Sequence, residues 1–575
     1  MMPMIKLAQL YEKLEEITSH KQIVDTLAEF FKKLGPEEAK IAAYLALGST
    51  GPKFEDTDMG LGNKFCVKAI SEAYNIEKNK VQEIFDEKGD LGDTAAYFSN
   101  RKKGRLSVKE VHERMVRIRD FAGEGSREKK IGGLAELLGD AISDEARYIM
   151  RIIVGKLRLG FGEQFLIEAL ARAFAGSEKD AGIIEDKYNI NTDIGAVAKS
   201  LASYGIAGIK RFSISLGRPV QAMLAKRVDT VKELDKRFPD EMAAEEKYDG
   251  ERAQVHFYSS DKVRIFSRRL TDITSQFPDI MEFTAKALKA EKAVLDGEIV
   301  AFKENGPESF QKLMQRRRKY DVEKYKDKIP VVIYLFDILY LDGRSLLKKP
   351  YPERRKLLEN SIRLNEKVKL ANRKVSSDFK EIEEFFETTI DKGYEGIIVK
   401  STKKDSIYQP GKRGFLWVKW KKEYAEGMRE TFDLVVVGTF YGKGRRKGTF
   451  GALLGAVRNK NKNRFETFTK VGSGFTDKDF KEIGKRLVKT EKKPVNLFVD
   501  EDMEPDEYVE PEMVIEVLGA EITTSPKHTA GREKSKKGYA LRFPRFLHIR
   551  EDKDPEQATT VEEIEELKQG EQKRN

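Results

Sequence analysis

The 575-residue sequence contains a single cysteine, Cys66, and only five histidines, which are scattered along the chain. One cysteine excludes disulfides within the chain and a cysteine-rich zinc module, and no histidines stand at a metal-binding spacing. We therefore expect a reducing compartment, the cytoplasm. Because Cys66 lies in an apolar-periodic stretch, we expect its side chain to be packed rather than reactive.

Long apolar runs are also missing. No stretch approaches the ~20 residues that a membrane span requires, and the N-terminal residues begin an amphipathic helix pattern rather than a signal peptide. The sequence has no internal repeat, no low-complexity tract and no Walker A loop. We therefore expect no membrane partner and no P-loop nucleotide site.

Charge, in contrast, is abundant. Charged residues make up 35% of the chain, and 107 Lys and Arg against 96 Asp and Glu leave a net charge of +11. This excess favours a polyanionic partner, but it also suits a solvated surface of mixed charge, and charge balance alone does not decide between them. A chain of this length exceeds one hydrophobic core, so we expect three or four domains.

The first part of the chain has a helical pattern, with apolar residues three and four positions apart, as in Leu7, Leu10 and Leu14. Two features in this part stay open. The basic cluster 101–105 suits a solvated turn or a phosphate contact. The glycines in 160–162, ahead of a helix pattern, could present backbone N–H groups to an anion or form a tight helix–helix turn.

After about residue 217 the apolar period shifts toward two, which is typical of strands. Several predicted strands carry acids among apolar residues, including Asp296, Glu298 and Asp337. Acids inside apolar strands are costly unless they are paired, hydrogen-bonded or metal-bound. A later strand contains both tryptophans, Trp417 and Trp420, which we expect to be core residues on one face.

From about residue 425 the pattern is all-β, with strands expected at 452–457, 465–471 and 513–518 and a short helix at 561–570. Short strands with glycine-rich turns suit a small barrel of the OB type, which is a common nucleic-acid platform.

The segment Glu245-Glu246-Lys247-Tyr248-Asp249-Gly250-Glu251-Arg252 has the form Lys-x-Asp-Gly-x-Arg. A lysine amine attacks phosphorus only when neutral, so its ordinary pKa of about 10.4 must fall toward ~7–8, which takes about 3–4 kcal/mol. A cation such as Arg252, a bound metal or burial would lower it. Gly250 would let the backbone approach a phosphate or turn sharply. The alternative is a plain Asp-Gly turn between two strands.

Further motifs follow in order along the rest of the chain. They are Ser267-Arg268-Arg269, Asp296-Gly297-Glu298, Phe336-Asp337, Glu395-Gly396-x-Ile398-x-Lys400, Trp417-x-Lys419-x-Lys421, and Arg542-Phe543-Pro544-Arg545 through Arg550-x-Asp552-Lys553. Each motif alone is weak, but the ordered set resembles the six-motif series of covalent nucleotidyltransferases. The close match is to ATP-dependent DNA ligases of the archaeal and eukaryotic replicative type.

The resemblance implies a multidomain fold in three parts. Residues 1–216 would form an all-α DNA-binding domain. Residues 217–421 would form an α+β nucleotidyltransferase (adenylation) domain with antiparallel sheets. Residues 422–575 would form an all-β OB-fold domain with a C-terminal helix.

The resemblance also implies roles for single residues. Lys247 would attack the α-phosphate of ATP and carry AMP as a phosphoramidate. Glu245 would accept a hydrogen bond from the adenine amino group, and the base would lie between Phe336 and Ile398. Contacts with ribose or phosphates are implied for Arg252 and Arg268, and contacts with ribose or Mg²⁺ for Glu298 and Glu395. Lys419 and Lys421 would bind the α-phosphate and stabilise the leaving charge. Pyrophosphate contacts are implied for Arg542, Arg545, Arg550, Asp552 and Lys553.

The implied activity is the sealing of nicks in duplex DNA, with ATP and Mg²⁺, in replication, repair and recombination. AMP would pass from Lys247 to the 5′-phosphate, and the 3′-hydroxyl would displace it. Such transfer depends mostly on positioning and charge neutralisation, which these cations and acids would supply. The implied partner is nicked double-stranded DNA, gripped through its backbone by a monomer in the cytoplasm, associated with the nucleoid.

Other readings remain. An RNA ligase or an RNA-capping guanylyltransferase shares the Lys-x-Asp-Gly core but needs no helical first domain. An NAD-dependent DNA ligase would be expected to carry a cysteine-rich zinc module, which a single cysteine rules out. A nucleic-acid-binding scaffold with an inactive nucleotidyltransferase domain would have no need for charges at Lys247, Glu298, Glu395 and Lys419.

The match includes one departure. Replicative ligases of this kind often carry a Gln-x-x-apolar-x-x-aromatic-aromatic or shorter Gln-x-x-Phe-Phe element that binds a sliding clamp. The comparable segment, 95–103, has the aromatic pair Tyr97-Phe98 and basic residues but no glutamine. The sequence therefore supports a sliding clamp as partner only through this aromatic pair.

Overall fold

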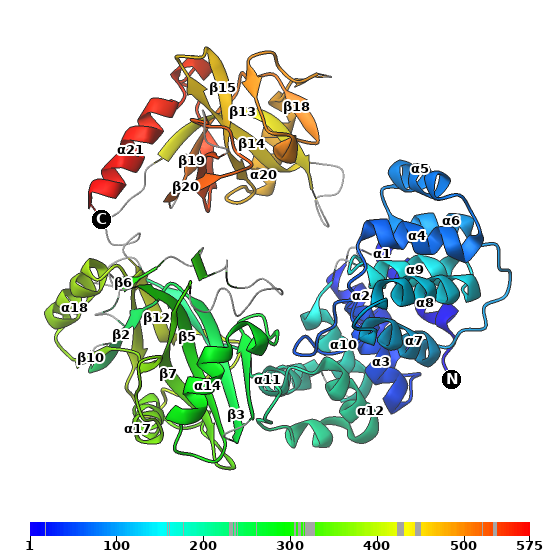
Figure 1. The fold of residues 1–575 in the computed structure, drawn as a ribbon, viewed down its shortest axis with the longest axis horizontal. Coiled ribbons are helices and arrows are strands. Elements are labelled where there is room, and N and C mark those ends of the chain that lie inside the picture. Colours follow the sequence, from blue (N-terminus) through cyan, green and yellow to red (C-terminus); the bar gives the residue numbers. More distant parts are fainter. Residues whose placement is uncertain are drawn as a thin grey trace. The chain divides into compact units, whose positions relative to one another are not determined.

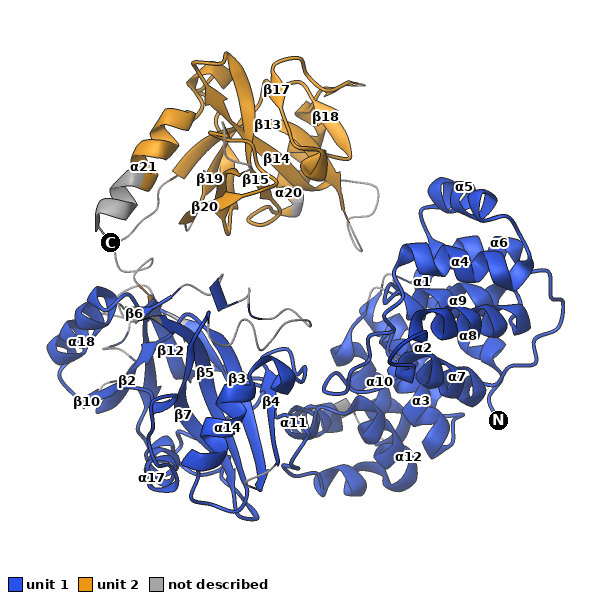
Figure 2. Ribbon diagram, in the orientation of Figure 1, with its two compact units in different colours: residues 1–420 blue, residues 421–575 orange. Residues whose placement is uncertain are grey.

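The computed structural model describes residues 1–17, 19–157, 159, 161–175, 178–228, 234, 237–238, 240–259, 262–303, 306–308, 312–313, 316, 328–421, 431–442, 450–490, 492–519, 521–532 and 537–574. The chain divides into two compact units, Met1–Trp420 and Lys421–Asn575 (Figure 2). No helix in these described ranges is both long and apolar enough to cross a membrane.

The first unit begins with helices that share one hydrophobic core (Figure 1). They are α1 Met4–Glu16, α2 His20–Phe31, α3 Pro36–Ala46, α4 Asn63–Tyr74, α5 Lys78–Lys88, α6 Leu91–Phe98, α7 Val108–Asp120, α8 Ser126–Asp140, α9 Ser143–Ile153, α10 Glu163–Phe174, α11 Ala181–Asn191 and α12 Ile194–Lys210. Leu7, Leu10 and Leu14 of α1 are buried, which confirms the helix period predicted from the sequence.

Two details of these helices bear on the sequence predictions. Cys66 is buried within α4, and burial raises the pKa of its thiol to about 12, so the prediction of a packed cysteine is confirmed. Of the glycines ahead of α10, Gly162 is the residue before the first helical turn, and Gly160 lies outside the described residues.

Two β-sheets follow the helices. One has five strands in the order β1-β12-β11-β2-β10, and the other has the order β4-β3-β5-β7-β8, with β6 beside β5 and β9 beside β7. Their bounds are β1 Leu224–Arg227, β2 Met242–Lys247, β3 Glu251–Ser259, β4 Lys262–Ser267, β5 Ala293–Lys303, β6 Gly306–Pro307, β7 Val331–Leu341, β8 Arg344–Ser345, β9 Val368–Leu370, β10 Arg373–Ser376, β11 Gly396–Ser401 and β12 Arg413–Lys421.

The expectation of antiparallel sheets holds for most of these strand pairs but not for all. β1 runs parallel to β12, and β9 runs parallel to β7, so both sheets are mixed. The reason is topological, since each parallel pair joins strands that lie far apart in the sequence and are not connected by a hairpin.

Among the described residues, the helices α14 (Pro278–Ala287), α17 (Tyr351–Ser361) and α18 (Phe379–Asp391) pack against the sheets. α14 contacts β4, β7 and β9, α17 contacts β7, and α18 contacts β2, β10 and β11.

The two tryptophans of β12 lie on opposite faces, so the prediction of one shared face is wrong. Trp420 stacks on Phe386 of α18, with ring centroids 4.0 Å apart, whereas Trp417 contacts Phe336 and Tyr408 edge-on. The physical reason is strand geometry, because residues an odd number apart along a strand point to opposite sides.

The second unit is rich in strands (Figure 1). Its strands are β13 Thr431–Tyr441, β14 Phe450–Asn459, β15 Arg464–Val471, β16 Lys489–Thr490, β17 Leu497–Phe498, β18 Glu507–Val509, β19 Val514–Leu518, β20 Glu521–Ser525, β21 Gly538–Arg542 and β22 Arg545–Ile549, and its helices are α20 Asp477–Arg486 and α21 Val561–Arg574. The strands predicted near 452–457, 465–471 and 513–518 are confirmed. The final helix runs four residues beyond its predicted end, and the sequence patterns did not predict α20.

Candidate active site

Lys247 is the last residue of β2, and its ammonium group forms an ion pair with Glu395. The two residues are also joined through the backbone, since the amide of Glu395 donates to the carbonyl of Lys247 at 3.2 Å. About a fifth of the Lys247 side chain is exposed. The ion pair therefore sits in a position that a small molecule can reach.

Two glycines of the motifs are required by this geometry. At Gly250, where the chain passes from β2 to β3, an added Cβ would lie 2.2 Å from the carbonyl oxygen of Ile299. Gly396 has φ +142°, which residues with a side chain rarely adopt. The chain bends at Gly250, but Asp249-Gly250 forms no hairpin, because β2 and β3 belong to different sheets.

Glu298 of β5 brings the second sheet to the ion pair. Burial raises the pKa of the Glu298 carboxyl to about 8, against the opposing effect of Lys247 and Arg252, and Glu395 and Asp296 raise it further. Two carboxylates and an ammonium group therefore meet where the two sheets approach each other.

Arg252 of β3 is held on several sides. Its guanidinium donates to both carboxylate oxygens of Asp296 at 3.1 and 2.7 Å, to the carbonyl of Met223 at 2.7 Å and to the hydroxyl of Tyr408 at 3.2 Å. An arginine has five N–H donors, so one stays available among the described partners. Asp296, an acid within an apolar strand, is thus paired with Arg252, as a buried charge requires.

Glu245 points to the same side of β2 as Lys247 and is almost fully buried. Its carboxylate accepts hydrogen bonds from Tyr351 at 2.5 Å and from Arg355 at 3.3 Å, and it ion-pairs with Lys400 at 2.6 Å. Burial lowers the pKa of Lys400, and Glu245 opposes that shift. The residue expected to read the adenine amino group therefore already has three partners within the protein.

Phe336 occupies a β-bulge. Asp296 pairs with Asp337 and Gly297 with Leu335, so Phe336 is the extra residue of β7. A bulge re-aims a side chain, and here the ring lies 4.9 Å from the ammonium of Lys400.

Ile398, the other residue expected to contact the base, pairs directly with Glu245 across β2 and β11. Directly paired residues of an antiparallel ladder share a face, so Ile398 lies on the side of Glu245 and Lys247. The structure thus places Ile398 beside the acid expected to read the base.

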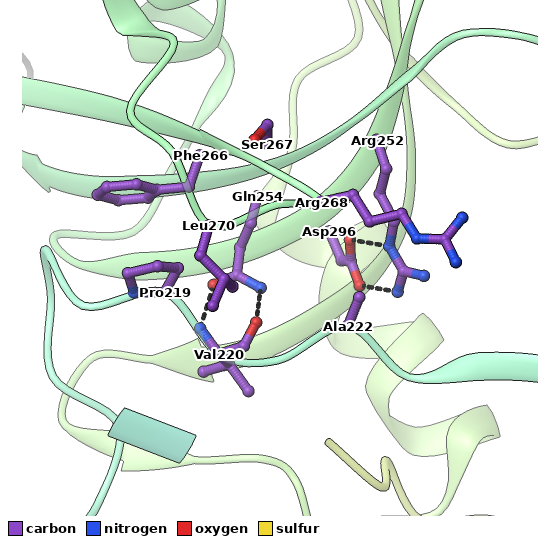
Figure 3. A pocket seen from close by; sticks show the side chains of 10 residues that line it. All are labelled: Pro219, Val220, Ala222, Arg252, Gln254, Phe266, Ser267, Arg268, Leu270 and Asp296. Carbon is purple, nitrogen blue, oxygen red and sulfur yellow. Dashed lines mark hydrogen bonds and ion pairs between the residues drawn. The ribbon is translucent and has the colours of Figure 1, made fainter. Parts of the chain in front are cut away.

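Arg268 borders a small cavity beside Arg252, Asp296 and Val220 (Figure 3). The cavity volume is about 10 Å³, close to the space of one water molecule, so it is too small for a nucleotide. Figure 3 shows Arg268 and Arg252 on the same side of this cavity, with Arg252 paired to Asp296. The Arg268 side chain is exposed.

Lys419 and Lys421 lie on β12, and the backbone of Lys419 accepts a hydrogen bond from Val228 at 3.1 Å. Residues two apart on a strand share a face, so both lysines point to the side of Trp417. The Trp417 ring lies 4.3 Å from the ammonium of Lys400. The face that carries the lysines is therefore the face that carries the Glu245 network.

Arg542 and Arg545 belong to the second unit. Arg542 ion-pairs with Glu521 at 3.0 Å, and Arg545 is exposed. The other cations of this motif pair locally: Arg550 with Asp433 at 2.8 Å and with Asp552 at 2.7 Å, and Lys553 with Asp433 at 2.5 Å.

Sequence reasoning gave no role to Lys400, Tyr351 or Arg355. Lys400 belonged to a motif, and a buried lysine two residues from Ile398 was a usable signal. Tyr351 and Arg355 lie on α17, over 100 residues from Glu245, and no spacing in the sequence links them to it. A further missed contact joins Asp337 to Arg354 through two hydrogen bonds at 2.8 and 2.9 Å.

The arrangement suits a lysine nucleophile beside acids that can share a hard cation. Within the described ranges, no three His, Cys, Asp or Glu side chains are grouped to hold a metal ion. Mg²⁺ is commonly bound by one or two carboxylates together with substrate phosphates. Glu298 and Glu395 fit that pattern, since a cation would offset the burial and the repulsion between carboxylates that together raise the pKa of Glu298.

Three family models match the chain. They describe a DNA ligase N terminus at residues 3–171, an ATP dependent DNA ligase domain at residues 222–421, and an ATP dependent DNA ligase C terminal region at residues 446–553.

Curated relatives match over almost their whole length. A protein named DNA ligase 1 from Methanosarcina acetivorans is 52% identical, with 98% of this chain and 99% of the relative covered. A protein named Probable DNA ligase from Aquifex aeolicus is 41% identical, with coverage of 98% and 97%. The solved structure named Pmar-Lig_Pre has a similar fold, with a TM-score of 0.54 at 17% identity over 95% of this chain and 99% of that one. The chain therefore belongs to the family of ATP-dependent DNA ligases.

Proposed function

We propose that Lys247 is the nucleophile that takes AMP from ATP in this ligase. The observation that carries the proposal is the contact of Lys247 with Glu395, beside Glu298 of the opposite sheet. A nucleophilic lysine attacks as the neutral amine, and a cation held by the two carboxylates would favour that form over the ammonium. The partly exposed position of Lys247 leaves a path for attack on a bound nucleotide.

The reaction has three steps. The Lys247 amine forms a bond to the α-phosphorus of ATP, loses a proton, and releases pyrophosphate. AMP then moves to the 5′-phosphate of a nick, which frees Lys247. The 3′-hydroxyl attacks that activated phosphate, which seals the strand and releases AMP. Mg²⁺ held by Glu298 and Glu395 would neutralise phosphate charge during the transfer.

The other site residues hold the nucleotide in this proposal. Glu245 accepts from the adenine amino group, and Phe336 and Ile398 contact the two faces of the base. Support comes from the bulge that re-aims Phe336 and from the direct pairing of Ile398 with Glu245. Ribose or phosphate contacts are proposed for Arg252, Arg268, Lys419 and Lys421, and pyrophosphate contacts for Arg542 and Arg545.

We also propose the division into domains at 1–216, 217–421 and 422–575. It is supported by the end of α12 at Lys210 and by the start of β1 at Leu224. An OB fold for the last domain is supported by β13, whose first half pairs with β19 and whose second half pairs with β18, while β14 follows its other edge. Pairing of one strand with two different strands along the same edge is typical of a sheet that closes into a barrel.

The partner proposed for the whole chain is nicked duplex DNA. A sliding clamp is a second proposed partner, supported by Tyr97, which is 58% exposed and packs edge-on against Phe98. A Tyr97→Ala, Phe98→Ala double variant that binds a cognate clamp as well as the parent would overturn this second proposal. Action as a monomer in the cytoplasm, associated with the nucleoid, stays a prediction.

The first experiment follows lysyl-AMP. The purified protein is treated with pyrophosphate to remove any bound AMP, then incubated with α-labelled ATP and Mg²⁺ and denatured. We expect label on the parent and on the control Lys286→Ala, whose side chain is two-thirds exposed, and none on Lys247→Ala.

The second stage supplies acceptors. Nicked DNA should discharge the label and become sealed, and the same nick in RNA should be a poorer acceptor. Label on Lys247→Ala at the parent's level would overturn the assignment of the nucleophile, and sealing of nicked RNA alone would overturn the assignment of the substrate.

A further inference from the structure

Glu245 is enclosed by three donors from outside its own strand. Tyr351 and Arg355 of α17 both donate to Oε1, and Lys400 of β11 contacts Oε2 at 2.6 Å. The side chains of Glu245 and Lys400 are 3% and 1% exposed. Oε1 therefore accepts two hydrogen bonds and Oε2 accepts one, which leaves Oε2 with a lone pair for one further donor.

Two of the donors are themselves fixed by backbone carbonyls. Arg355 donates to the carbonyl of Ala371 at 2.8 Å, and Lys400 donates to the carbonyl of Phe336 at 3.3 Å. The Lys400 contact matters most for geometry, because it joins the carboxylate of Glu245 to the backbone of the residue proposed to stack on the base. The acceptor and the stacking ring are therefore held at a set separation.

The chemistry of the bases makes such an acceptor selective. Adenine presents an amino donor at position 6, and guanine presents a carbonyl acceptor there, which would face a carboxylate without a hydrogen bond. A site built to hydrogen-bond one group rejects an analogue without it far more strongly than an apolar pocket rejects a change in size.

We infer that Tyr351, Arg355 and Lys400 are positioning residues that hold Glu245 as a fixed hydrogen-bond acceptor and thereby set the preference of this enzyme for adenine over other purine nucleotides. This rests on the proposed function, in which Glu245 meets the 6-amino group. The three residues contact Glu245, which in this proposal meets the base, so their removal changes the choice of base more than the chemistry of transfer.

The test compares three α-labelled triphosphates in the full-length protein stripped of AMP: ATP, purine riboside triphosphate, which has no 6-amino group, and GTP. The readout is kcat/KM for label transfer to Lys247. We expect Tyr351→Phe, which removes one hydroxyl, to lower the ratio of ATP to purine riboside triphosphate by about tenfold. Lys400→Met should lower it at least as much and raise the relative use of GTP.

A double-variant cycle separates positioning from general damage. In a Glu245→Ala background, Tyr351→Phe should leave the ratio unchanged, because its effect passes through Glu245. The matched control is Tyr11→Phe, which removes a buried hydroxyl from α1 in the helical part of the chain and should leave the ratio at the parent's value.

Each outcome decides the matter. An equal loss of kcat/KM with all three triphosphates in both Tyr351→Phe and Lys400→Met would mean that these residues have a structural role only. That result would overturn the inference. An unchanged ratio in both variants would overturn it as well. A parent protein that labels Lys247 with none of the triphosphates would instead refute the proposed function, and the inference with it.

Discussion

His256 lies fully buried on β3, between the aromatic ring of Phe266 and the backbone of the segment ahead of the sheets. Its Nδ1 accepts from the amide of Gly217 at 3.1 Å, and its Nε2 lies 2.9 Å from the side-chain oxygen of Gln254. These contacts require the neutral ring with the proton on Nε2. Burial, with a further contribution from Arg264, lowers the pKa of His256 to about 3.

This residue predicts a loss of stability in mild acid. The unfolded chain binds a proton on His256 below its ordinary pKa of about 6.5, whereas the folded chain does not until about pH 3, so stability falls as pH falls through that window. Between pH 7.5 and pH 5 the loss from His256 is about 2 kcal/mol. Urea unfolding of the parent and of His256→Asn at both pH values measures it.

The difference between the two proteins isolates the histidine, because all other titrating groups are shared. Asparagine can accept from Gly217 but does not titrate, so His256→Asn should lose less stability between pH 7.5 and pH 5. Equal losses in parent and variant would contradict the assignment of a neutral buried ring.

At the scale of residues, the motifs identified the residues of the proposed site but not the residues that hydrogen-bond them. Lys247, Glu298 and Glu395 stood in recognisable spacings because the proposed chemistry needs them at set positions on strands or directly beside them. The supports of Glu245 come from α17, a helix remote in sequence, and only the folded chain brings them together.

At the scale of elements, side chains of β3 form hydrogen bonds with the backbone of the segment ahead of β1. Three alternate residues on one face of β3 hold that segment: Arg252 hydrogen-bonds to Met223, Gln254 to Val220 and His256 to Gly217.

The same segment is also hydrogen-bonded to the end of the helical part. There Thr192 donates to the carbonyl of Pro219 at 2.6 Å, and the amide of Gln221 donates to the carbonyl of Asn189 at 2.7 Å. Arg252, a residue of the proposed nucleotide site, is thus tied to the segment that leads from the helices into the sheets.

Of these three β3 residues, Gln254 is the one whose substitution tests the hydrogen bonds most directly. Its amide accepts from the Val220 N–H at 2.7 Å and donates to the Val220 carbonyl at 3.0 Å, as a neighbouring strand would. Gln254→Leu keeps a similar volume and removes the partners of both buried groups of Val220 and of Nε2 of His256, so we expect a loss of about 2–3 kcal/mol in urea unfolding and faster hydrogen exchange at Val220. The control Gln164→Leu, at an exposed position of α10, should change stability by less than about 0.5 kcal/mol. Slow hydrogen exchange at Val220 in Gln254→Leu would show that the hydrogen bonds of Gln254 are not needed to hold this segment.

The elements themselves were predictable where periodicity alone decides them, as in α1 and the strands of the second unit. The bulge at Phe336 and the parallel placement of β1 beside β12 were not, since both depend on pairing between distant segments. The opposite faces of Trp417 and Trp420 could have been predicted from the sequence, because residues an odd number apart on a strand point to opposite faces.

At the scale of the whole molecule, the net charge of +11 suits the proposed partner, nicked duplex DNA. A protein that grips duplex DNA through its phosphates releases counterions on binding, and its affinity falls steeply as salt rises. Ion pairs within the fold take up many of the cations, as Arg252 and Arg355 show, so the contacts with DNA must come from side chains that these networks leave exposed.

The resulting prediction concerns binding by the full-length protein. Affinity for a nicked duplex should fall on the order of 10³-fold between 50 and 200 mM KCl, as for six or more phosphate contacts, and should be equal for two nicked duplexes of unrelated sequence. Fluorescence anisotropy in Ca²⁺, with AMP-stripped Lys247→Ala to prevent turnover, measures both. Label transfer from ATP to the parent without DNA is the control and should fall far less, because the small nucleotide is held by fewer charges. A flat salt dependence, or a strong preference for one sequence, would mean that base or apolar contacts carry the binding instead of the charge excess.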